Sequence, residues 1–397
     1  MRLPERGAGR RPQRLPRVAV AVLLLLCLAA GCGYGSRRPH AAAAPAVGTG
    51  PPLSARTVTI GYFANITHAT PLVGVQEGFF TDELGGTRLR TQLFNGGPAA
   101  LEALNAGAVD IAWMGPSPAV SGYVRSKGRS LRIVSGSASG GVSLVVDPDR
   151  ARHGTDLRGL RIATPELGNT QDVALLHWIR EQGWHVDPRT GRGDVTLLRQ
   201  PNREIPTSFR RGAIDGAWVP EPVAAQLVAA GGKALLDERS LWKGGEFVTA
   251  NVVASQRFLD RHPDVVEAVL RGSVRTNAWI AAHPDRARTS ADRAIRALTG
   301  RSLEAGVLDR AWRHVTFLDD PLAATLATEA GHAAALGLPG TARAADLAGI
   351  YDLGPLDRVL AREGRPPVDD AGLGVGGHPQ GPDPGQDPTP SDSQGNG

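Results

Sequence analysis

Short β-branched apolar runs alternate along this chain with longer segments in which apolar residues recur at helical spacing. The runs that predict strands lie at residues 57–60, 131–134, 143–146 and 160–163. The segments that predict helices lie at residues 98–107, 118–126, 170–183 and 263–282. Strand–helix alternation of this kind predicts an α/β fold with mainly parallel strand pairing.

The N-terminal residues follow a different pattern. Residues 1–17 contain six arginines and one acidic residue, and an uncharged apolar run from Val18 to Ala30 leads into Gly31 and Cys32. This is the layout of a secretory signal peptide, and the apolar run is shorter than the ~20 residues that a membrane-spanning helix needs. We therefore predict a signal peptide over residues 1–31.

The segment Leu28-Ala29-Ala30-Gly31-Cys32 resembles a bacterial lipobox, in which the cysteine is lipidated and becomes the mature N-terminus. Ala29 departs from the usual pattern, where leucine is more common. The resemblance implies a lipid on Cys32, and the alternative is cleavage elsewhere with Cys32 as one more small residue. The only other cysteine is Cys27, so the sequence predicts no disulfide in the mature domain.

Two further segments have little to bury. Residues 32–54 are rich in Gly, Ala and Pro and predict a flexible linker, and residues 369–397 predict a disordered tail. The predicted binding domain is then residues 55–368. The net charge of +5 comes from the N-terminus, because residues 1–40 contain eight arginines and one acidic residue. The rest of the chain is close to neutral, which argues against a nucleic-acid partner.

One stretch of the chain is echoed about a hundred residues later. Gly107–Trp113 reads GAVDIAW and Gly212–Trp218 reads GAIDGAW, and a proline-containing turn follows each. The likeness predicts two lobes built from similar strand–turn–helix units. The alternative is that both are examples of a common surface turn before an apolar strand.

Several turns have the composition of helix N-termini, where free backbone N–H groups and the helix dipole attract anions. In the first turn Thr67 or Thr70 is the expected cap before Pro71; in the second, Ser117 is the expected cap before Pro118. The third turn has Asn169 or Thr170 as its cap, and residues 135–141 predict a flexible hydroxyl-rich loop. Each turn alone is equally explained as an ordinary cap.

Four longer stretches carry a family resemblance. GYFANITHATPLVGVQEGFF, NGGPAALEALNAGAVDIAWMGPSPAVSGY, DLRGLRIATPELGNTQDVALLHWIREQGW and GAIDGAWVPEPVAAQLV resemble the aliphatic-sulfonate, taurine and nitrate binding proteins of ABC importers. The resemblance implies a type II periplasmic-binding-protein-like fold of two α/β lobes that close on a solute. It places lobe one at residues 55–145 plus 248–368 and lobe two at 146–247, with the hinge at the two crossings.

The same resemblance implies a set of ligand-binding residues. On lobe one these are Asn65, His68, Ser117, Ser139 and Gly140. On lobe two they are Asn169, Thr170 and Gln171, with Trp218 as an apolar wall. Glu221 and Thr249 are further candidates. Glu221 would repel a bare anion, so it is expected to bind an amine on the solute or to orient its neighbours. His68 is expected either to face the anion or to serve as a hydrogen-bonded spacer.

The function expected from these observations is solute binding rather than catalysis. The chain would bind a small anionic solute, an aliphatic sulfonate, and deliver it as a lipid-anchored extracytoplasmic monomer to a permease and its ATPase. Nitrate and a thiamine-precursor pyrimidine are alternative cargoes, and a sensory role is a further alternative. An enzyme of pyrimidine metabolism shares such a fold, but no catalytic motif is visible. No cofactor or metal site is expected.

Overall fold

The computed structural model describes residues 48–338, 340 and 344–376. All the described residues belong to one compact unit. The predicted signal peptide, Cys32 and most of the predicted linker therefore lie outside the described residues, as do residues 377–397 of the predicted tail. Within the described residues, no helix is both long and apolar enough to cross a membrane.

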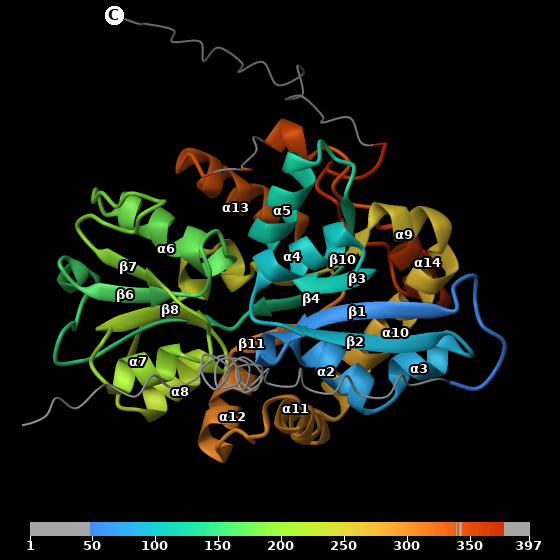
Figure 1. Ribbon diagram of the computed structural model, residues 1–397, viewed down its shortest axis with the longest axis horizontal. Coiled ribbons are helices and arrows are strands. Elements are labelled where there is room, and N and C mark those ends of the chain that lie inside the picture. The colour runs from blue at the N-terminus through green and yellow to red at the C-terminus, as the bar shows by residue number, and fades with distance from the viewer. Residues whose placement is uncertain (1–47, 339, 341–343, 377–397) are drawn as a thin grey trace, which may run out of the picture. The chain divides into compact units, whose positions relative to one another are not determined.

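Two mixed sheets organise the described residues (Figure 1). The first has the strand order β11-β4-β10-β3-β1-β2 and the second has the order β7-β6-β8-β5-β9. The first sheet consists of β1 (Thr57–Phe63), β2 (Arg88–Phe94), β3 (Ile111–Met114), β4 (Leu131–Gly140), β10 (Val248–Ser255) and β11 (Val315–Phe317). The second sheet consists of β5 (Val142–Val146), β6 (Arg161–Thr164), β7 (Thr196–Arg199), β8 (Gly216–Pro220) and β9 (Lys233–Asp237).

The expectation of mainly parallel pairing is wrong. The pairs β1–β2, β1–β3, β6–β7 and β6–β8 are parallel, whereas β10 pairs antiparallel with both β3 and β4, and β5 pairs antiparallel with both β8 and β9. The strand β11 is also antiparallel to β4. The antiparallel strands β4, β5 and β10 are those that carry the chain between the sheets, and strand–helix alternation does not reveal these passages.

Helices cover both faces of the first sheet. Those that pack around it are α2 (Ala69–Gln76), α3 (Phe79–Leu84), α4 (Gly97–Ala106), α5 (Pro116–Arg125), α9 (Gln256–Arg261), α10 (Pro263–Ala282), α11 (Pro284–Thr299), α12 (Ala305–Arg313), α13 (Ala323–Ala335) and α14 (Gly354–Arg362). Successive strand residues point to opposite faces. Trp113 thus packs in the core with α2 and α10, whereas its neighbours Ala112 and Met114 pack in the core with α4 and α5.

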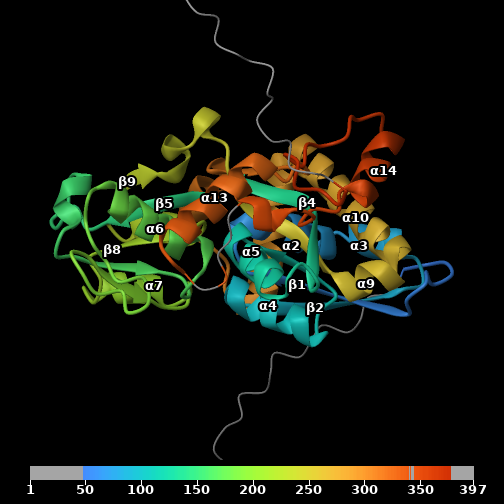
Figure 2. The ribbon, with the colours of Figure 1, turned by 90° about the horizontal axis from the view of Figure 1, so that it is seen from above.

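The second sheet is covered in the same way by α6 (Thr170–Glu181) on one face and by α7 (Ile205–Arg210) and α8 (Val223–Ala229) on the other. Trp218 packs with α6, and its neighbours Ala217 and Val219 pack with α8. The short 3-10 helices are η2 (Ile66–His68), η3 (Gly154–Leu157), η4 (Glu238–Leu241), η5 (Lys243–Gly245) and η6 (Ala344–Leu347). The helix α13 contacts both α5 and α6, so it joins the helices of the two sheets (Figure 2).

The echoed segments occupy equivalent places in the two sheets. Asp110, just before β3, accepts a hydrogen bond from the Thr59 backbone N–H at 2.8 Å, and Asp215, just before β8, accepts one from the Arg161 N–H at 2.9 Å. In each case the aspartate N–H donates back to the carbonyl of the same residue. Each aspartate therefore ties its strand to the neighbouring parallel strand, as expected for related strand–turn–helix units.

The chain leaves the first sheet at Gly140 and Gly141, between β4 and β5, a few residues before the expected crossing at 145. It returns at β10, which begins at Val248. Gly140 and Gly141 have φ angles of 72° and 70°, a region that residues with a Cβ rarely adopt. A Cβ on Gly140 would also approach the His314 carbonyl oxygen to 2.8 Å. This crossing therefore requires glycine.

Two boundary predictions are wrong where the structure describes them. Residues 48–54 of the predicted linker lie against the domain, where the Ser54 N–H donates to Asp264 Oδ2 at 2.8 Å and Pro52 forms a bridge with Gly85. Residues 369–376 of the predicted tail are also ordered, because Leu373 is buried and its carbonyl accepts hydrogen bonds from Gly349 and Tyr351. Single apolar residues and backbone pairing hold these segments, and composition does not show either.

Candidate functional site

A pocket lies where the turns that follow β1, β3, β6, β7 and β8 meet. Most of its lining residues are polar but uncharged; they are Phe63, Asn65, Thr67, His68, Gly115, Asn169, Thr170, Gln171, Asn202, Pro220 and Thr249. All five strands take part in parallel pairs of the two sheets, and their carboxyl ends face this pocket from both sides. Open α/β sheets bind ligands at this edge, so the topology itself explains why these residues converge.

The helix α6 brings three neighbouring lining residues to the pocket from the second sheet. Asn169 is its N-cap, and the Asn169 side-chain oxygen accepts a hydrogen bond from the Thr170 N–H at 3.0 Å. Thr170 and Gln171 form the first turn and are buried. The first backbone N–H groups of a helix have no partner within it, and with the helix dipole they favour an anion.

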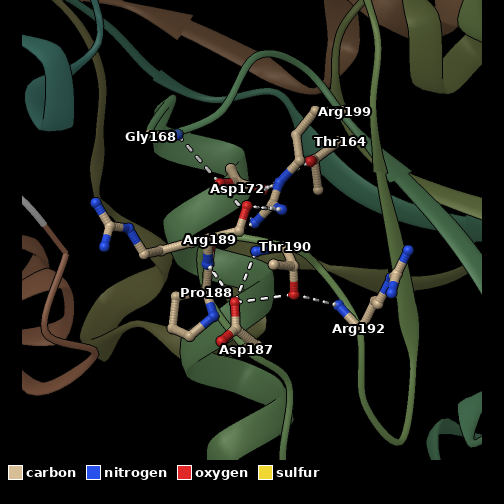
Figure 3. Close-up of polar contacts among 9 residues, drawn as sticks. All are labelled: Thr164, Gly168, Asp172, Asp187, Pro188, Arg189, Thr190, Arg192 and Arg199. Atoms are coloured by element: carbon tan, nitrogen blue, oxygen red, sulfur yellow. Dashed lines mark hydrogen bonds and ion pairs between the residues drawn. The ribbon is translucent and has the colours of Figure 1, made fainter.

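The position of that helix end is fixed by a buried ion pair (Figure 3). The Asp172 carboxylate, with a fully buried side chain, accepts hydrogen bonds from Arg199 Nε at 2.8 Å, Thr164 Oγ at 2.8 Å and the Gly168 N–H at 3.1 Å. The contacts come from both β6 and β7 and from the turn before α6. A negative charge in the first turn also suits the helix dipole.

Arg199 extends this network away from the pocket. Its second terminal nitrogen donates to the Pro188 carbonyl at 2.8 Å, in the turn where Asp187 accepts hydrogen bonds from the backbone of Arg189 and Thr190 (Figure 3). Arg199 thus connects the start of α6 to a turn of the second lobe that does not line the pocket. The network holds the turn at Gly168 to Thr170 in one geometry.

Three lining residues place buried polar atoms in the pocket without a partner. His68 Nδ1, Thr170 Oγ and Asn202 Oδ1 have no hydrogen-bond partner among the described residues. Buried polar groups are nearly always paired, and leaving one unpaired costs ~1–3 kcal/mol. The three residues come from both lobes and line the same pocket. They are therefore positioned to bind a polar solute.

His68 is electrically neutral in this arrangement. Its side chain is buried, its ring lies on that of Phe63 with centroids 4.2 Å apart, and burial lowers its pKa to about 3. Desolvation disfavours the charged imidazolium. An anion beside the ring would act in the opposite direction and raise the pKa.

Six of the residues expected in the site do line the pocket: Asn65, His68, Asn169, Thr170, Gln171 and Thr249. The Thr249 hydroxyl is partly engaged, because it donates to the Gly140 carbonyl at 2.6 Å. The structure therefore brings together candidates that lie as far apart in the sequence as Asn65 and Thr249.

The other expected residues lie elsewhere. The residues 135–141, expected to form a flexible loop, belong mostly to β4, because β4 pairs with β10 and β11 along this stretch. Ser139 is buried there and accepts a hydrogen bond from the Phe247 N–H at 3.3 Å, and Gly140 contributes to the crossing between sheets. Ser117 lines a separate pocket described below.

Trp218 and Glu221 are also buried in the protein interior and do not line the pocket. Trp218 is fully buried, and its Nε1 donates to Glu238 Oε2 at 2.6 Å, so it does not form the expected apolar wall. Glu221 Oε2 accepts a hydrogen bond from the Ala225 N–H at 2.9 Å, and burial raises the pKa of its carboxyl. The Glu221 side chain therefore anchors the start of α8 and does not line the pocket.

Only one of the three predicted helix N-caps is confirmed. Asn169 caps α6 as predicted, but α5 begins at Pro116 with Gly115 as its N-cap, ahead of Ser117 and Pro118. Neither Thr67 nor Thr70 caps α2, because the 3-10 helix η2 precedes it and the Thr70 hydroxyl donates to Asn277 Oδ1. The Ser117-Pro118 and Thr70-Pro71 pairs match the capping pattern, but each lies two residues after the observed N-cap.

The sequence reasoning missed five lining residues: Phe63, Thr67, Gly115, Asn202 and Pro220. Phe63 and Pro220 end the strands β1 and β8, and Asn202 follows β7. The rule that ligands bind at the carboxyl ends of parallel strands would have indicated all three, had the strand order been known. Thr67 was expected only as a helix cap, and Gly115 lies in the turn whose expected ligand contact was Ser117.

The two lobes touch around this pocket. The Ile66 N–H donates to the Glu221 carbonyl at 3.2 Å, and an Arg203 terminal nitrogen donates to Asn95 Oδ1 at 2.6 Å. Thr170 lies so near Gly115 that a Cβ on this glycine would overlap its hydroxyl. The described conformation is therefore closed. Within the described residues, no three His, Cys, Asp or Glu side chains are grouped so as to hold a metal ion.

Sequence comparison places this arrangement among known proteins. The model of the NMT1-like family matches residues 52–295, which is more than half of the chain. The taurine-binding periplasmic protein of Escherichia coli (strain K12) is 27% identical over 228 residues, which is 57% of this chain and 68% of that protein. A putative binding protein of Brucella abortus (strain 2308) is 26% identical over 167 residues, 41% of this chain and 48% of that protein.

Solved structures share the fold. The alkanesulfonate-binding protein SsuA from Xanthomonas axonopodis pv. citri, bound to MOPS, has a TM-score of 0.59 at 20% identity and covers 72% of this chain and 94% of its own. The nitrate-binding protein NrtA from Synechocystis PCC 6803 has a TM-score of 0.61 at 14% identity and covers 72% and 83%. The chain therefore has the two-lobed fold of periplasmic solute-binding proteins, as the sequence predicts.

Proposed function

The chain belongs to the NMT1-like family, and from this premise we propose that it is an extracytoplasmic solute-binding protein that delivers a small anionic solute, an aliphatic sulfonate, to an ABC importer. Its relative from Escherichia coli is a taurine-binding protein, and the structural neighbours include alkanesulfonate- and nitrate-binding proteins. The proposal is for a binding protein and not for an enzyme.

One observation carries the choice of an anion. His68 Nδ1 and Thr170 Oγ are buried without a partner in a pocket that also receives the N-terminus of α6. A hydroxyl, an imidazole and helix N–H groups together donate hydrogen bonds to an oxyanion, and the helix dipole favours its charge. Because no arginine or lysine is among the lining residues, neutral donors would carry the recognition.

The choice of a sulfonate rests on the two kinds of surface in the pocket. The ring of Phe63 and the ring of Pro220 supply apolar surface beside the donors of Asn65, Thr170 and Gln171. An alkyl sulfonate has a charged head and an apolar tail, which require these two surroundings. Nitrate has no tail, and a pyrimidine has no oxyanion head.

Location and delivery form the remaining part of the proposal. A signal peptide over residues 1–31 and a lipid on Cys32 would hold the domain at the outer face of the cell membrane, next to a permease and its ATPase. The closed arrangement of the lobes supports recognition of a solute-loaded form by the permease, since closure changes the surface that a partner meets. The protein would act as a monomer.

A thermal-shift panel on the purified protein tests the cargo. Propanesulfonate and taurine are expected to raise Tm, with stabilisation approaching ~2.7 kcal/mol when the solute exceeds Kd about 100-fold. Propan-1-ol, which keeps the tail and lacks the head, is the matched control and should leave Tm unchanged. A response to nitrate alone, or to an aminopyrimidine alone, would overturn the sulfonate assignment.

Delivery requires a separate test. Solute-loaded protein should co-purify with a permease from detergent-solubilised membranes of its own cells, and a protein with Cys32→Ser should lose its membrane attachment. Recovery of Cys32→Ser protein in the membrane fraction would contradict the lipid anchor. Recovery of a receptor in place of a permease would favour a sensory role.

A further inference from the structure

A second pocket lies beside the first, where α5 and α6 meet. Pro116, Ser117 and Gly168 line the second pocket, whereas the adjacent residues Gly115 and Asn169 line the first. The second pocket is also bounded by α13, which contacts both α5 and α6. It is therefore built from helices of both lobes.

The most unusual group in this pocket is the carboxyl of Glu329, on α13. The residue is only 6% exposed, and neither of its carboxyl oxygens has a hydrogen-bond partner among the described residues. Ser117 Oγ, across the pocket on α5, is likewise buried without a partner. A buried carboxyl with both oxygens unpaired is costly, and breaking a buried ion pair by removing one partner costs ~3–5 kcal/mol. The arrangement resembles such a pair with one member missing.

Among the residues that the structure describes, the charges that act on Glu329 do not supply that member. The charged group that acts on it is the Glu238 carboxyl, which repels it, and burial together with this repulsion raises the pKa of Glu329 well above its ordinary value. Tyr351 also lies near, since the charge of Glu329 contributes to raising the pKa of its phenol, and its hydroxyl is buried without a partner as well. His332 on the same helix stacks instead on His177, with ring centroids 3.5 Å apart.

Ser121 adds one further hydroxyl to the lining, and most of the other lining residues are apolar. Val120 on α5, Val173 on α6, and Ala330 and Ala333 on α13 are all buried. A hard metal ion needs several oxygen ligands, which this lining does not offer. A primary ammonium group has three N–H donors, enough for both carboxyl oxygens and the serine hydroxyl, and its alkyl chain would contact the valines.

We propose that the pocket formed by α5, α6 and α13 is a binding site for a small primary alkylammonium ion, held by the carboxylate of Glu329 and the hydroxyl of Ser117. The site is separate from the anion pocket, so it stands whether or not the solute is a sulfonate. Because its walls come from both lobes, an amine bound there would favour the closed arrangement.

Calorimetric titration of the purified protein with propylammonium tests this site. We expect binding by propylammonium and none by propan-1-ol, which has a similar size and no charge. Because burial raises the pKa of Glu329, binding of a cation should release a proton from its carboxyl, and the affinity should be higher at pH 8 than at pH 6. Absence of binding, equal binding of the alcohol, or a higher affinity at pH 6 would overturn the proposal.

Two variants and a control locate the effect. Glu329→Gln should weaken propylammonium binding about 30-fold or more, because it removes the charge and keeps the shape. Glu329→Asp, which retains the charge but withdraws it by one methylene, should weaken binding by less. The control Glu246→Gln, at an exposed position, should bind as the unmodified protein does. Unchanged binding by Glu329→Gln would contradict the site.

Competition separates this proposal from the proposed function. Saturating propanesulfonate should not displace propylammonium, because the two ligands would occupy different pockets. Displacement would place the amine in the anion pocket and overturn the second site. Failure of propanesulfonate to bind at all would contradict the sulfonate cargo, while the pH dependence and the Glu329 variants would still decide the amine site.

Discussion

Gly115 and Thr170 face each other across the boundary between the lobes, and the space between them does not admit one further carbon atom. A Cβ built on Gly115 would overlap the Thr170 hydroxyl. The φ of Gly115 is −69°, which any residue adopts, so glycine is needed here for space and not for backbone conformation. The contact belongs to the closed arrangement, in which Thr170 also lines the anion pocket.

Gly115→Ala is therefore expected to hinder closure without disturbing either lobe. Overpacking at such a contact costs ~1–3 kcal/mol, so Kd for the solute should rise about tenfold. The control is Gly306→Ala on α12, where an added Cβ would meet no atom within 4 Å. Calorimetry on both variants checks this expectation, and equal Kd values for the two would contradict the role of this contact in closure.

The ion pair between Asp172 and Arg199 is expected to stabilise the second lobe strongly. The side chain of Asp172 is 0% exposed and that of Arg199 is 13% exposed, so Arg199→Met leaves a buried carboxylate without its partner. The expected loss is about 3 kcal/mol in the free energy of unfolding, measured by urea denaturation. Solute affinity should fall as well, since the ion pair positions the start of α6.

An exposed ion pair in the same lobe provides the control. Arg158 and Asp194 lie 2.8 Å apart with side chains 65% and 26% exposed, so Arg158→Met should cost less than about 1 kcal/mol. Both variants remove the arginine partner of an aspartate. A difference between their losses in the free energy of unfolding therefore reports the effect of burial. Similar losses for the two variants would show that the Asp172 network does not have the structural role assigned to it.

The solute affinity is expected to depend on pH through His68. Burial lowers the pKa of this imidazole to about 3 in the free protein, and a bound anion would raise it. Binding would then take up a proton, so affinity should increase as pH falls from 8 to 5, and His68→Gln should remove the dependence. An affinity that is flat over this range would exclude a charged His68 in the complex.

The same pKa has a consequence for stability without ligand. An imidazole with pKa near 6.5 in the unfolded chain and about 3 in the folded protein favours folding when neutral. Its contribution is present above about pH 6.5 and is lost as pH falls towards 3. The free energy of unfolding should therefore fall less steeply on acidification in His68→Gln than in the unmodified protein.

Glu238 should act in the opposite pH range. Burial raises its pKa to about 7, above the ordinary value of 4.5, although its carboxylate accepts the Trp218 N–H. Its contribution to stability is present below about pH 4.5 and is lost as pH rises through 7. Between pH 5 and pH 8, the free energy of unfolding should therefore fall less in Glu238→Gln than in the unmodified protein. The exposed Glu204→Gln is the control. Identical pH profiles for the two variants would contradict this assignment.

Local sequence signals predicted the second-lobe half of the site well. Asn169, Thr170 and Gln171 follow a β-branched strand and carry a capping residue at the start of a helix, and both features are determined by neighbouring residues. The helices predicted at 98–107, 118–126, 170–183 and 263–282 agree with α4, α5, α6 and α10 to within about two residues at each end. Such features depend on interactions between residues that are close together in the chain, so the sequence alone predicts them.

The errors arise where distant segments decide the outcome. Ser139 and Gly140 read as a flexible loop, but β10 and β11 pair with them from more than a hundred residues away. Trp218 occupies the position in its lobe that Trp113 occupies in the other, and both are fully buried. The echo between the two segments therefore favours a core role for Trp218 and not a ligand contact.

The most direct test of the central claim is calorimetric titration of propanesulfonate into the unmodified protein, Thr170→Val and the exposed control Thr299→Val. Valine keeps the shape of threonine and removes only the hydroxyl. An anion pocket at the start of α6 predicts binding that weakens about tenfold or more in Thr170→Val and stays unchanged in Thr299→Val. Failure of propanesulfonate to bind, or equal affinity in all three proteins, would contradict the account.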